Sequence, residues 1–274
     1  SLCEKSRNAC ARSVQKSFPV GDFVEQKVGN NRMSRQEKAW IKPGYLSQVF
    51  RADERRMEFD CKNQTIIQKE CPVDIVFIGD SITQMWELEA YFHQYHLMIL
   101  NRGIGGDRTK SFLHRFYADA IQLKPKMVMI MVGINDAWDL EFDPWKREPV
   151  RETEDVLQEA LFNMEQVLKK ASMEEFQTVV CSILPTNMAW TNHEAERKKY
   201  VRSYNEGMKE LTCRYGLKFI DYYPYFVDRD GESLQLELSL EGLHPNVFGY
   251  DKMAEILENE IDFSSLTFDS KYNG

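Results

Sequence analysis

The sequence predicts a three-layer α/β/α sandwich built around a five-stranded parallel, flavodoxin-like sheet. Two observations lead to this fold class: five short apolar runs recur along the chain, and stretches with the apolar spacing of a helix lie between them. Strands that are buried on both faces have no polar side, and right-handed crossovers place helices on both faces of such a sheet. From the fold class we expect the strand order 2-1-3-4-5.

Each element of this fold has a counterpart in the sequence. A helix is predicted where apolar residues recur at intervals of three or four, as they do at residues 156–171 and 250–261. Residues 46–61 are compatible with a further helix. The predicted strands are residues 73–79, 97–100, 127–132, 178–184 and 217–221.

Residues 1–72 differ in composition from the rest of the 274-residue chain. They are polar, rich in Lys, Arg, Asn and Gln, and contain few long apolar runs. We interpret residues 1–72 as an N-terminal extension that packs on the main domain or on a partner subunit, so a homo-oligomer is one of the two expected arrangements. Residues 73–274 form the predicted main domain.

Charge and hydropathy restrict the possible partners. The net charge of −8 argues against a nucleic-acid partner, because proteins that bind nucleic acid usually present a basic surface. The sequence has no apolar run of about 18 residues, so we expect no stable membrane insertion. The first residues lack the apolar core of a signal peptide, and we therefore expect a cytoplasmic protein unless such a peptide has been removed.

The six cysteines do not indicate a metal site, because no CxxC pair occurs. The spacing of Cys61 and Cys71 leaves a disulfide between them possible. Cys181 lies within an apolar run, and we expect it to be a reduced residue of the core.

Polar, glycine-bearing segments follow the predicted strands. In a doubly wound sheet the ligand binds beyond the carboxyl ends of the strands. Residues 79–82, 101–107 and 133–136 follow the first three strands, and residues 241–245 precede the last helix. We therefore expect these four segments to meet at one site.

Ser81 lies at the turn between the first strand and the next helix. A serine here can act as a nucleophile, and its amide, at the positive end of a helix, can donate to an oxyanion. It can also be a plain helix N-cap. Gly79 would let the backbone turn tightly, and Asp80 can fix the loop as a first-turn carboxylate.

The next two segments offer further hydrogen-bond donors. Gly105 and Gly106 expose backbone amides, and the carboxamide of Asn135 can donate to an oxyanion. For the glycines the alternatives are a tight turn with positive φ or a phosphate cradle, and for Asn135 the alternative is an Asx turn.

His244 is the predicted base. It follows Glu241 by three residues, and a turn with this spacing brings a carboxylate within reach of the imidazole Nδ1–H. A lone Glu-x-x-His pair is common on protein surfaces, so the assignment rests on the order of all four segments at the strand ends.

In that order the segments resemble the conserved blocks of the SGNH hydrolases, also called GDSL-like esterases. The matching stretches are GDSIT, the glycine of NRGIGGD, GIND and EGLHPN, over residues 73–260. The longer stretches VFIGDSITQMW and NRGIGGDRT are most similar to the branch of platelet-activating factor acetylhydrolase and bacterial sugar-ester deacetylases.

The resemblance implies a serine esterase that needs no metal or organic cofactor. Ser81 would be the nucleophile and His244 the base, with an acyl-enzyme as intermediate. The family has an aspartate three residues before the histidine, whereas this sequence has Glu241, whose longer side chain must fold back to reach the ring. The oxyanion hole would be formed by Ser81, Gly106 and Asn135, with Asp80 and Asp136 as supporting residues.

The expected substrate is a short-chain ester, above all an acetyl ester, of a small molecule, a carbohydrate or a lipid. Aromatic residues near the strand ends can stack on a sugar or serve as core and loop anchors; they are Trp86, Trp138, Trp145 and Trp190. Two alternative interpretations are a binding module that kept the fold without activity, and a flavodoxin-like nucleotide or flavin protein. The second does not explain Asn135 and His244.

Overall fold

The computed structural model describes residues 50–141 and 150–266. Several of the predictions above fall outside these residues: residues 1–49 of the N-terminal extension, the first part of the helix predicted at 46–61, and Trp145.

The sheet has five strands that pair in parallel, in the order β2-β1-β3-β4-β5. This is the predicted order, and the fold class is confirmed. The carboxyl ends of the first three strands are level, because Gly79 at the end of β1 pairs with Gly103 of β2 and with Met131 of β3. The strands are β1 Ile75–Gly79, β2 Ile99–Gly103, β3 Met127–Met131, β4 Gln177–Cys181 and β5 Lys218–Ile220.

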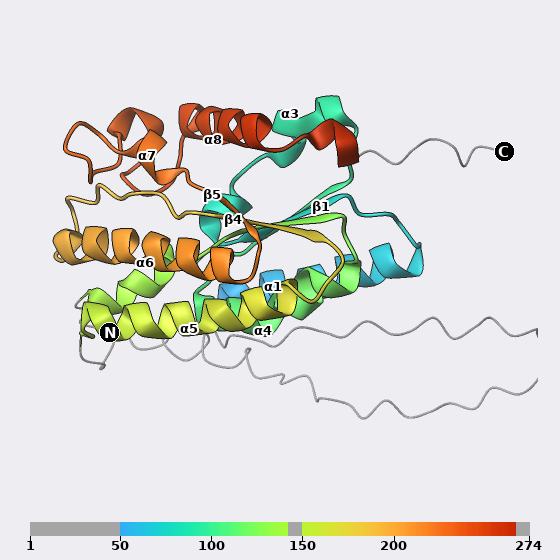
Figure 1. Cartoon of the computed structure of the whole chain (residues 1–274), viewed down its shortest axis with the longest axis horizontal. Helices are drawn as coiled ribbons and strands as arrows, with labels where there is room; N and C mark the ends of the chain where they lie inside the picture. Colours follow the sequence, from blue (N-terminus) through green and yellow to red (C-terminus); the bar gives the residue numbers. More distant parts are fainter. Residues whose placement is uncertain (1–49, 142–149, 267–274) are drawn as a thin grey trace, which may run out of the picture. The chain divides into compact units, whose positions relative to one another are not determined.

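Helices cover both faces of the sheet, as Figure 1 shows. On one side lie α3 Leu88–Phe92, α7 Tyr223–Phe226 and α8 Val247–Glu260, and on the other lie α1 Phe50–Gln68, α4 Thr109–Asp119, α5 Thr153–Ala171 and α6 Glu194–Arg214. The short helix α2, Ser81–Gln84, follows β1 directly. The 3₁₀ turns are η1 His93–Tyr95, η2 Ile121–Leu123, η3 Ile134–Leu140, η4 Leu236–Leu238 and η5 Phe263–Leu266.

The second strand extends further than the sequence indicated. It was predicted at residues 97–100 and runs from Ile99 to Gly103, through two polar residues. These residues are accommodated because they have partners. Asn101 donates to the carbonyls of Thr83 and Trp86 at 2.7 and 3.1 Å, and the buried Arg102 donates to Asn63.

A buried network of polar side chains joins α1 to α4. Arg56 of α1 is paired with Asp119 of α4, and Asn63 donates to the same carboxylate at 3.1 Å. The Asn63 oxygen accepts from Arg102 at 2.8 and 3.1 Å, and Arg115 contacts Asp119 at 3.1 Å. The part of the predicted extension that the structure describes thus packs on the main domain, and its remaining arrangement stays a prediction.

The cysteines of the described part are free thiols, so the possible disulfide between Cys61 and Cys71 is wrong. Cys61 lies in the exposed surface of α1, and Cys71 lies beyond the end of that helix. Cys181 is buried and free, as predicted for a core residue.

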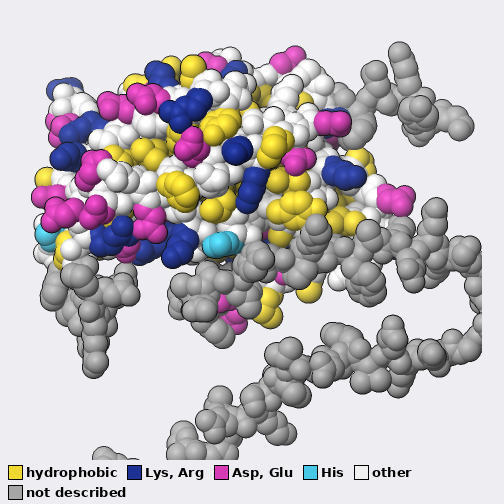
Figure 2. Space-filling model, turned by 60° about the horizontal axis from the view of Figure 1, so that its bottom comes forward, with side chains coloured by type: hydrophobic (Ala, Val, Ile, Leu, Met, Phe, Trp, Pro, Cys, Tyr) yellow, Lys and Arg dark blue, Asp and Glu magenta, His cyan; other side chains and the backbone are white. Residues whose placement is uncertain are grey.

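The surface carries both signs of charge. Figure 2 shows acidic and basic side chains interspersed with hydrophobic ones on the face that it presents. Within residues 50–141 and 150–266, none of the helices combines the length and the hydropathy that a bilayer crossing requires.

Candidate active site

Ser81 is the first residue of α2, directly after the sheet. The N-cap of this helix is Asp80, whose side chain accepts a hydrogen bond from the Ile82 amide at 3.0 Å. Capping is therefore done by Asp80, and the alternative interpretation of Ser81 as the N-cap is wrong. The Ser81 hydroxyl is free to engage another part of the chain.

Gly79 is required by close approach of neighbouring groups. A Cβ at this position would lie 2.2 Å from the Met131 carbonyl oxygen and 2.3 Å from Thr83 Oγ1. Gly79 is not among the residues with positive φ, so the predicted tight turn is not the reason for a glycine here. Its small size lets β3 and α2 come close to the end of β1, and this close packing fixes the position of Ser81 at the start of α2.

His244 meets Ser81 across 163 residues of sequence. Ser81 Oγ and His244 Nε2 lie 2.8 Å apart, and His244 Nδ1 contacts Glu241 Oε1. An ionised carboxylate only accepts hydrogen bonds, so Nδ1 carries the proton and Nε2 is left as the acceptor for the Ser81 hydroxyl. The three side chains thus form a continuous chain of hydrogen bonds.

Backbone contacts hold the segment around His244 in place. The carbonyl of His244 accepts from the Leu240 amide at 2.8 Å, and Asn246 caps α8 by accepting from the Gly249 amide at 3.1 Å. The Tyr250 hydroxyl donates to the Ile82 carbonyl at 2.8 Å. This last bond joins α8, which follows His244, to α2, which carries Ser81.

The loop after β2 approaches Ser81 at Gly105. A Cβ on Gly105 would lie 3.8 Å from the Ser81 Cβ, and the Gly105 amide donates to Gln84 Oε1 at 2.6 Å. Gly106 has a φ of 77°, which favours glycine, and it is exposed. The positive φ proposed as an alternative for this loop is therefore present at Gly106, whose backbone lies at the surface.

Asn135 is buried in the 3₁₀ turn that follows β3. Its Nδ2 donates to the carbonyl of Asp107 at 3.1 Å, so the side chain reaches across to the glycine loop. Two buried tyrosines of α6 hold the backbone before this turn: Tyr200 donates to the Gly133 carbonyl at 2.9 Å and Tyr204 to the Val132 carbonyl at 2.8 Å.

Asp136 joins the same turn to the start of α4. Its carboxylate accepts from the Thr109 amide at 3.0 Å and from Thr109 Oγ1 at 2.6 Å. The sequence analysis missed this partner, as it missed the tyrosines of α6, because nothing in the local sequence signals contacts of such long range.

Two buried carboxyl groups under the site have raised pKa values. Burial raises the pKa of Asp80 from 3.8 to about 7, partly offset by the Ile82 amide. Burial also raises the pKa of Asp136 to about 6, against the opposing effect of its bonds to Thr109. Both groups therefore gain protons more readily in the folded chain than in the unfolded one.

The Asp80 shift makes stability depend on pH. Because its pKa is higher in the folded state, the folded chain binds more protons between pH 4 and pH 7, and stability falls as the pH rises through that window. The change amounts to about 4 kcal/mol, at 1.36 kcal/mol per unit of pKa. We expect Asp80→Asn, which keeps an acceptor for the Ile82 amide, to flatten this decline in urea unfolding curves measured from pH 4 to pH 8. The explanation is wrong if variant and wild type lose stability equally.

Two of the tryptophans flank the site and one supports it from within. Trp86 is buried and stacks on Tyr250 with ring centroids 5.5 Å apart, so it is an anchor. The ring centroids of Trp138 and Trp190 lie 6.3 Å apart. Trp190 is 63% exposed, and its Nε1 donates to the Glu241 carbonyl at 3.2 Å, which places an exposed aromatic ring beside the His244 segment.

Apolar side chains also flank His244, which the sequence analysis did not anticipate. Leu240, Val247 and Phe248 are more than half exposed, and all three lie within four residues of His244. The signal in the sequence was the apolar residues on either side of EGLHPN.

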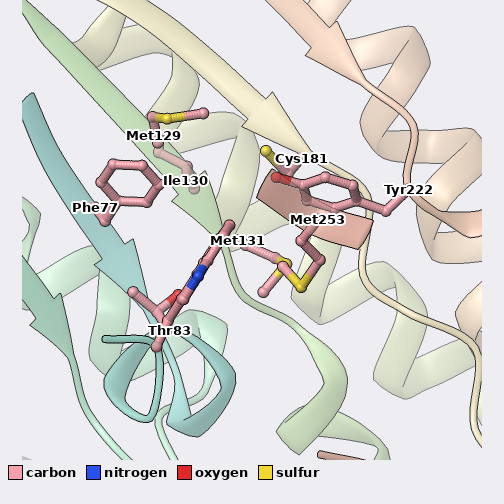
Figure 3. Close-up of a pocket in the computed structure, with 9 residues that line it drawn as sticks. Phe77, Thr83, Met129, Ile130, Met131, Cys181, Tyr222 and Met253 are labelled. Carbon is pink, nitrogen blue, oxygen red and sulfur yellow. The ribbon is translucent and has the colours of Figure 1, made fainter. Parts of the chain in front are cut away.

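A separate cavity lies inside the molecule, as shown in Figure 3. Apolar residues of β1, β3 and β4 line it together with Met253 of α8, and Thr83, Trp86 and Tyr222 complete the wall. Of the residues that the sequence analysis placed at the site, Trp86 lines this cavity, whereas the predicted triad and oxyanion residues do not. In the described part of the chain, no group of three or more His, Cys, Asp or Glu side chains is placed to hold a metal ion.

Comparison with known proteins gives consistent matches. Residues 77–252 match the model of the GDSL-like lipase/acylhydrolase family. An acetylxylan esterase of Geobacillus stearothermophilus is 24% identical over 216 residues, covering 69% of this chain and 94% of the relative. Platelet-activating factor acetylhydrolase IB subunit alpha1 of Rattus norvegicus is 26% identical, covering 70% of this chain and 76% of the relative.

Solved structures show the same fold. A GDSL-like lipase from Bacteroides thetaiotaomicron superposes with a TM-score of 0.61 at 22% identity, covering 74% of this chain and 95% of that structure. The acetylxylan esterase of Geobacillus stearothermophilus, in a catalytic mutant form, gives a TM-score of 0.56 at 20% identity, covering 72% of this chain and 95% of that structure.

Proposed function

The chain belongs to the GDSL-like lipase/acylhydrolase family and is a carboxylic ester hydrolase, and from this premise we propose that it removes short acyl groups, above all acetyl, through an acyl-enzyme formed on Ser81. The observation that carries the proposal is the 2.8 Å contact between Ser81 Oγ and His244 Nε2, with Glu241 on the far side of the imidazole. Family membership also argues against the flavin and nucleotide alternative.

In the first half of the proposed reaction, Ser81 Oγ attacks the ester carbonyl carbon while His244 Nε2 takes its proton. The carbonyl electron pair moves onto oxygen and gives a tetrahedral oxyanion. When this intermediate collapses, the bond to the alcohol oxygen breaks, and the imidazolium returns the proton to that oxygen. The alcohol leaves and the acyl group stays on Ser81.

In the second half, a water molecule replaces the alcohol. His244 takes a proton from the water, whose oxygen attacks the acyl carbon, and the second tetrahedral intermediate collapses to release the acid. Ser81 recovers its proton from His244, so the protein is unchanged at the end. The reaction needs one water molecule and no metal or redox cofactor.

The oxyanion of both intermediates needs preorganised donors. We assign this role to the amides of Ser81 and Gly106 and to the side chain of Asn135. Support comes from three features: the Ser81 amide lies at the start of α2, the glycine loop approaches Ser81, and Asn135 is fixed against that loop. One such donor contributes about 2.7–4 kcal/mol to the transition state in comparable sites.

Glu241 is proposed as the acid that orients His244, in place of the family's aspartate. Glu241→Gln removes the charge that stabilises the imidazolium and can favour the wrong tautomer, so we expect kcat to fall by about 10²- to 10⁴-fold. The side chain of Glu241 is 39% exposed, and water can replace part of its contribution. Assays with p-nitrophenyl acetate at saturating concentration measure this change in kcat.

The matched control is Glu237→Gln, an exposed glutamate of the preceding turn, which should leave kcat within twofold of wild type. Glu241→Asp should retain more activity than Glu241→Gln, because it keeps the charge. Equal kcat in wild type and Glu241→Gln would mean that another group orients His244.

The experiment that tests the function combines turnover with labelling. The purified protein should hydrolyse p-nitrophenyl acetate faster than p-nitrophenyl esters of long acids, and a fluorophosphonate probe should modify the peptide that contains Ser81, as read by mass spectrometry. Labelling at another residue would contradict the assignment. A panel of acetylated sugars and short-chain phospholipids then identifies the alcohol, for which Trp190 on one flank and Phe248 on the other are the candidate contacts.

A further inference from the structure

We propose that Arg115 is a positioning residue that sets the spacing of the three oxyanion donors; the inference rests on the function proposed above. Arg115 lies in α4, does not touch Ser81 or His244 in the structure, and has a side chain that is only 2% exposed. It acts through the end of β1 and the loop after β2, which carry two of the donors and hold the third.

A single guanidinium group binds the ends of two strands and the loop that follows the second. Arg115 Nη2 donates to the Gly79 carbonyl at 2.8 Å, and Nη1 donates to the Arg102 carbonyl at 2.9 Å. Nε donates to Asp107 Oδ2 at 2.7 Å. The partners are the end of β1, the end of β2 and the loop that follows β2.

Two of these partners, Gly79 and Asp107, lie next to proposed donors. Gly79 precedes Ser81 by two residues, and Asp107 follows Gly106 immediately. The carbonyl of Asp107 accepts from Asn135 at 3.1 Å, so the third donor is held by the same residue that Arg115 fixes. A shift of Arg115 would therefore move the two amides and the carboxamide relative to one another.

Only arginine can make this set of contacts. The guanidinium is planar and presents five N–H donors in a fixed arrangement, whereas the lysine ammonium is a compact point charge with three. Arg115, Asp107 and Asp119 are all buried, so solvent does not easily replace a contact that is lost. Lysine at this position would keep the charge but release at least one of the two carbonyls.

Helix α1 completes the arrangement from outside the family match. Arg115 Nη1 also contacts Asp119 Oδ2 at 3.1 Å, and the other oxygen of Asp119 is paired with Arg56 of α1. The matched region begins at residue 77, after α1 has ended at Gln68. The orientation of Arg115 therefore depends on a helix that the family model does not include.

The test is Arg115→Lys, assayed with p-nitrophenyl acetate well below its own unfolding temperature. We expect kcat to fall about 10- to 100-fold with KM within threefold of wild type, because a displacement of about 1 Å can cost 10²-fold in rate. The affinity for a boronic acid, whose serine adduct is tetrahedral, should weaken by the same factor as kcat/KM.

Two further variants separate positioning from stability. Leu168→Ala removes a fully buried side chain of α5 and should lower Tm, yet keep wild-type kcat and boronate affinity. Asp107→Asn keeps the size of the side chain and should reproduce the loss of Arg115→Lys, and it serves as the test if Arg115→Lys does not fold.

The inference is overturned if the folded Arg115→Lys or Asp107→Asn variant keeps wild-type kcat and boronate affinity. It is equally overturned if Leu168→Ala loses as much of both as the Arg115 variant at a matched drop in Tm. An inactive wild-type protein would instead refute the proposed esterase function, so the two failures are distinguishable.

Discussion

Ser81→Ala is expected to lower kcat for p-nitrophenyl acetate by about 10⁴- to 10⁶-fold, the range found when a nucleophile of this kind is removed. The loss follows because the proposed acyl-enzyme cannot form without Oγ. The side chain and amides proposed as oxyanion donors remain in this variant, so a residual rate above the uncatalysed reaction should survive. Tm should change little, because the side chain is small and the N-cap of α2 is supplied by Asp80.

Ser172→Ala is the matched control for this variant. Ser172 is exposed at the end of α5, and its hydroxyl donates to the Lys169 carbonyl at 3.0 Å. It should behave as wild type. If Ser81→Ala retained more than a tenth of the wild-type kcat and fluorophosphonate still labelled the protein, the nucleophile would have to be sought elsewhere.

His244→Ala should lower kcat by a similar factor. Without the imidazole no group accepts the Ser81 proton, and none returns a proton to the leaving alcohol. Residues that act as one unit are not additive, so the double variant Ser81→Ala/His244→Ala should be no slower than either single variant. This comparison is more informative than either single loss.

The control for the histidine is His93→Ala, in an exposed 3₁₀ turn on α3's side of the molecule, which should leave kcat unchanged. Steady-state kinetics of wild type, the two single variants, the double variant and His93→Ala test this expectation. Losses that multiplied in the double variant would show that Ser81 and His244 act independently and would contradict the proposed proton transfer.

The fold was predictable because burial on both faces leaves a strong local pattern. β1 and β3 are apolar throughout, and β4 is apolar from Val179 onwards. In the helices between the strands, apolar residues recur every three to four positions. The bounds of β2 were not predictable, because Asn101 and Arg102 are polar and lie in the strand only through partners elsewhere in the chain.

The residues of the proposed site, too, were predictable only in part. GDS, GIND and EGLHPN are contiguous stretches, so their chemistry could be recognised without coordinates. The capping by Asp80 is a local contact with the Ile82 amide and was predicted in part, as a first-turn carboxylate that fixes the loop. The reason for Gly79 depends on the Met131 carbonyl of another strand, and the predicted tight turn was not the reason. Arg115 has the appearance of a surface charge in the sequence, and only the packing of α1 and α4 shows that it is buried.

The shared ionic network between α1 and α4 has a consequence for how the chain can be shortened. A fragment cut to the family boundaries would deprive Asp119 of Arg56 and Arg102 of Asn63. Removing one partner of a buried ion pair costs about 3–5 kcal/mol, a large share of the roughly 5–15 kcal/mol by which domains are stable. The minimal expressible enzyme is therefore longer than its recognisable signature and must begin ahead of α1.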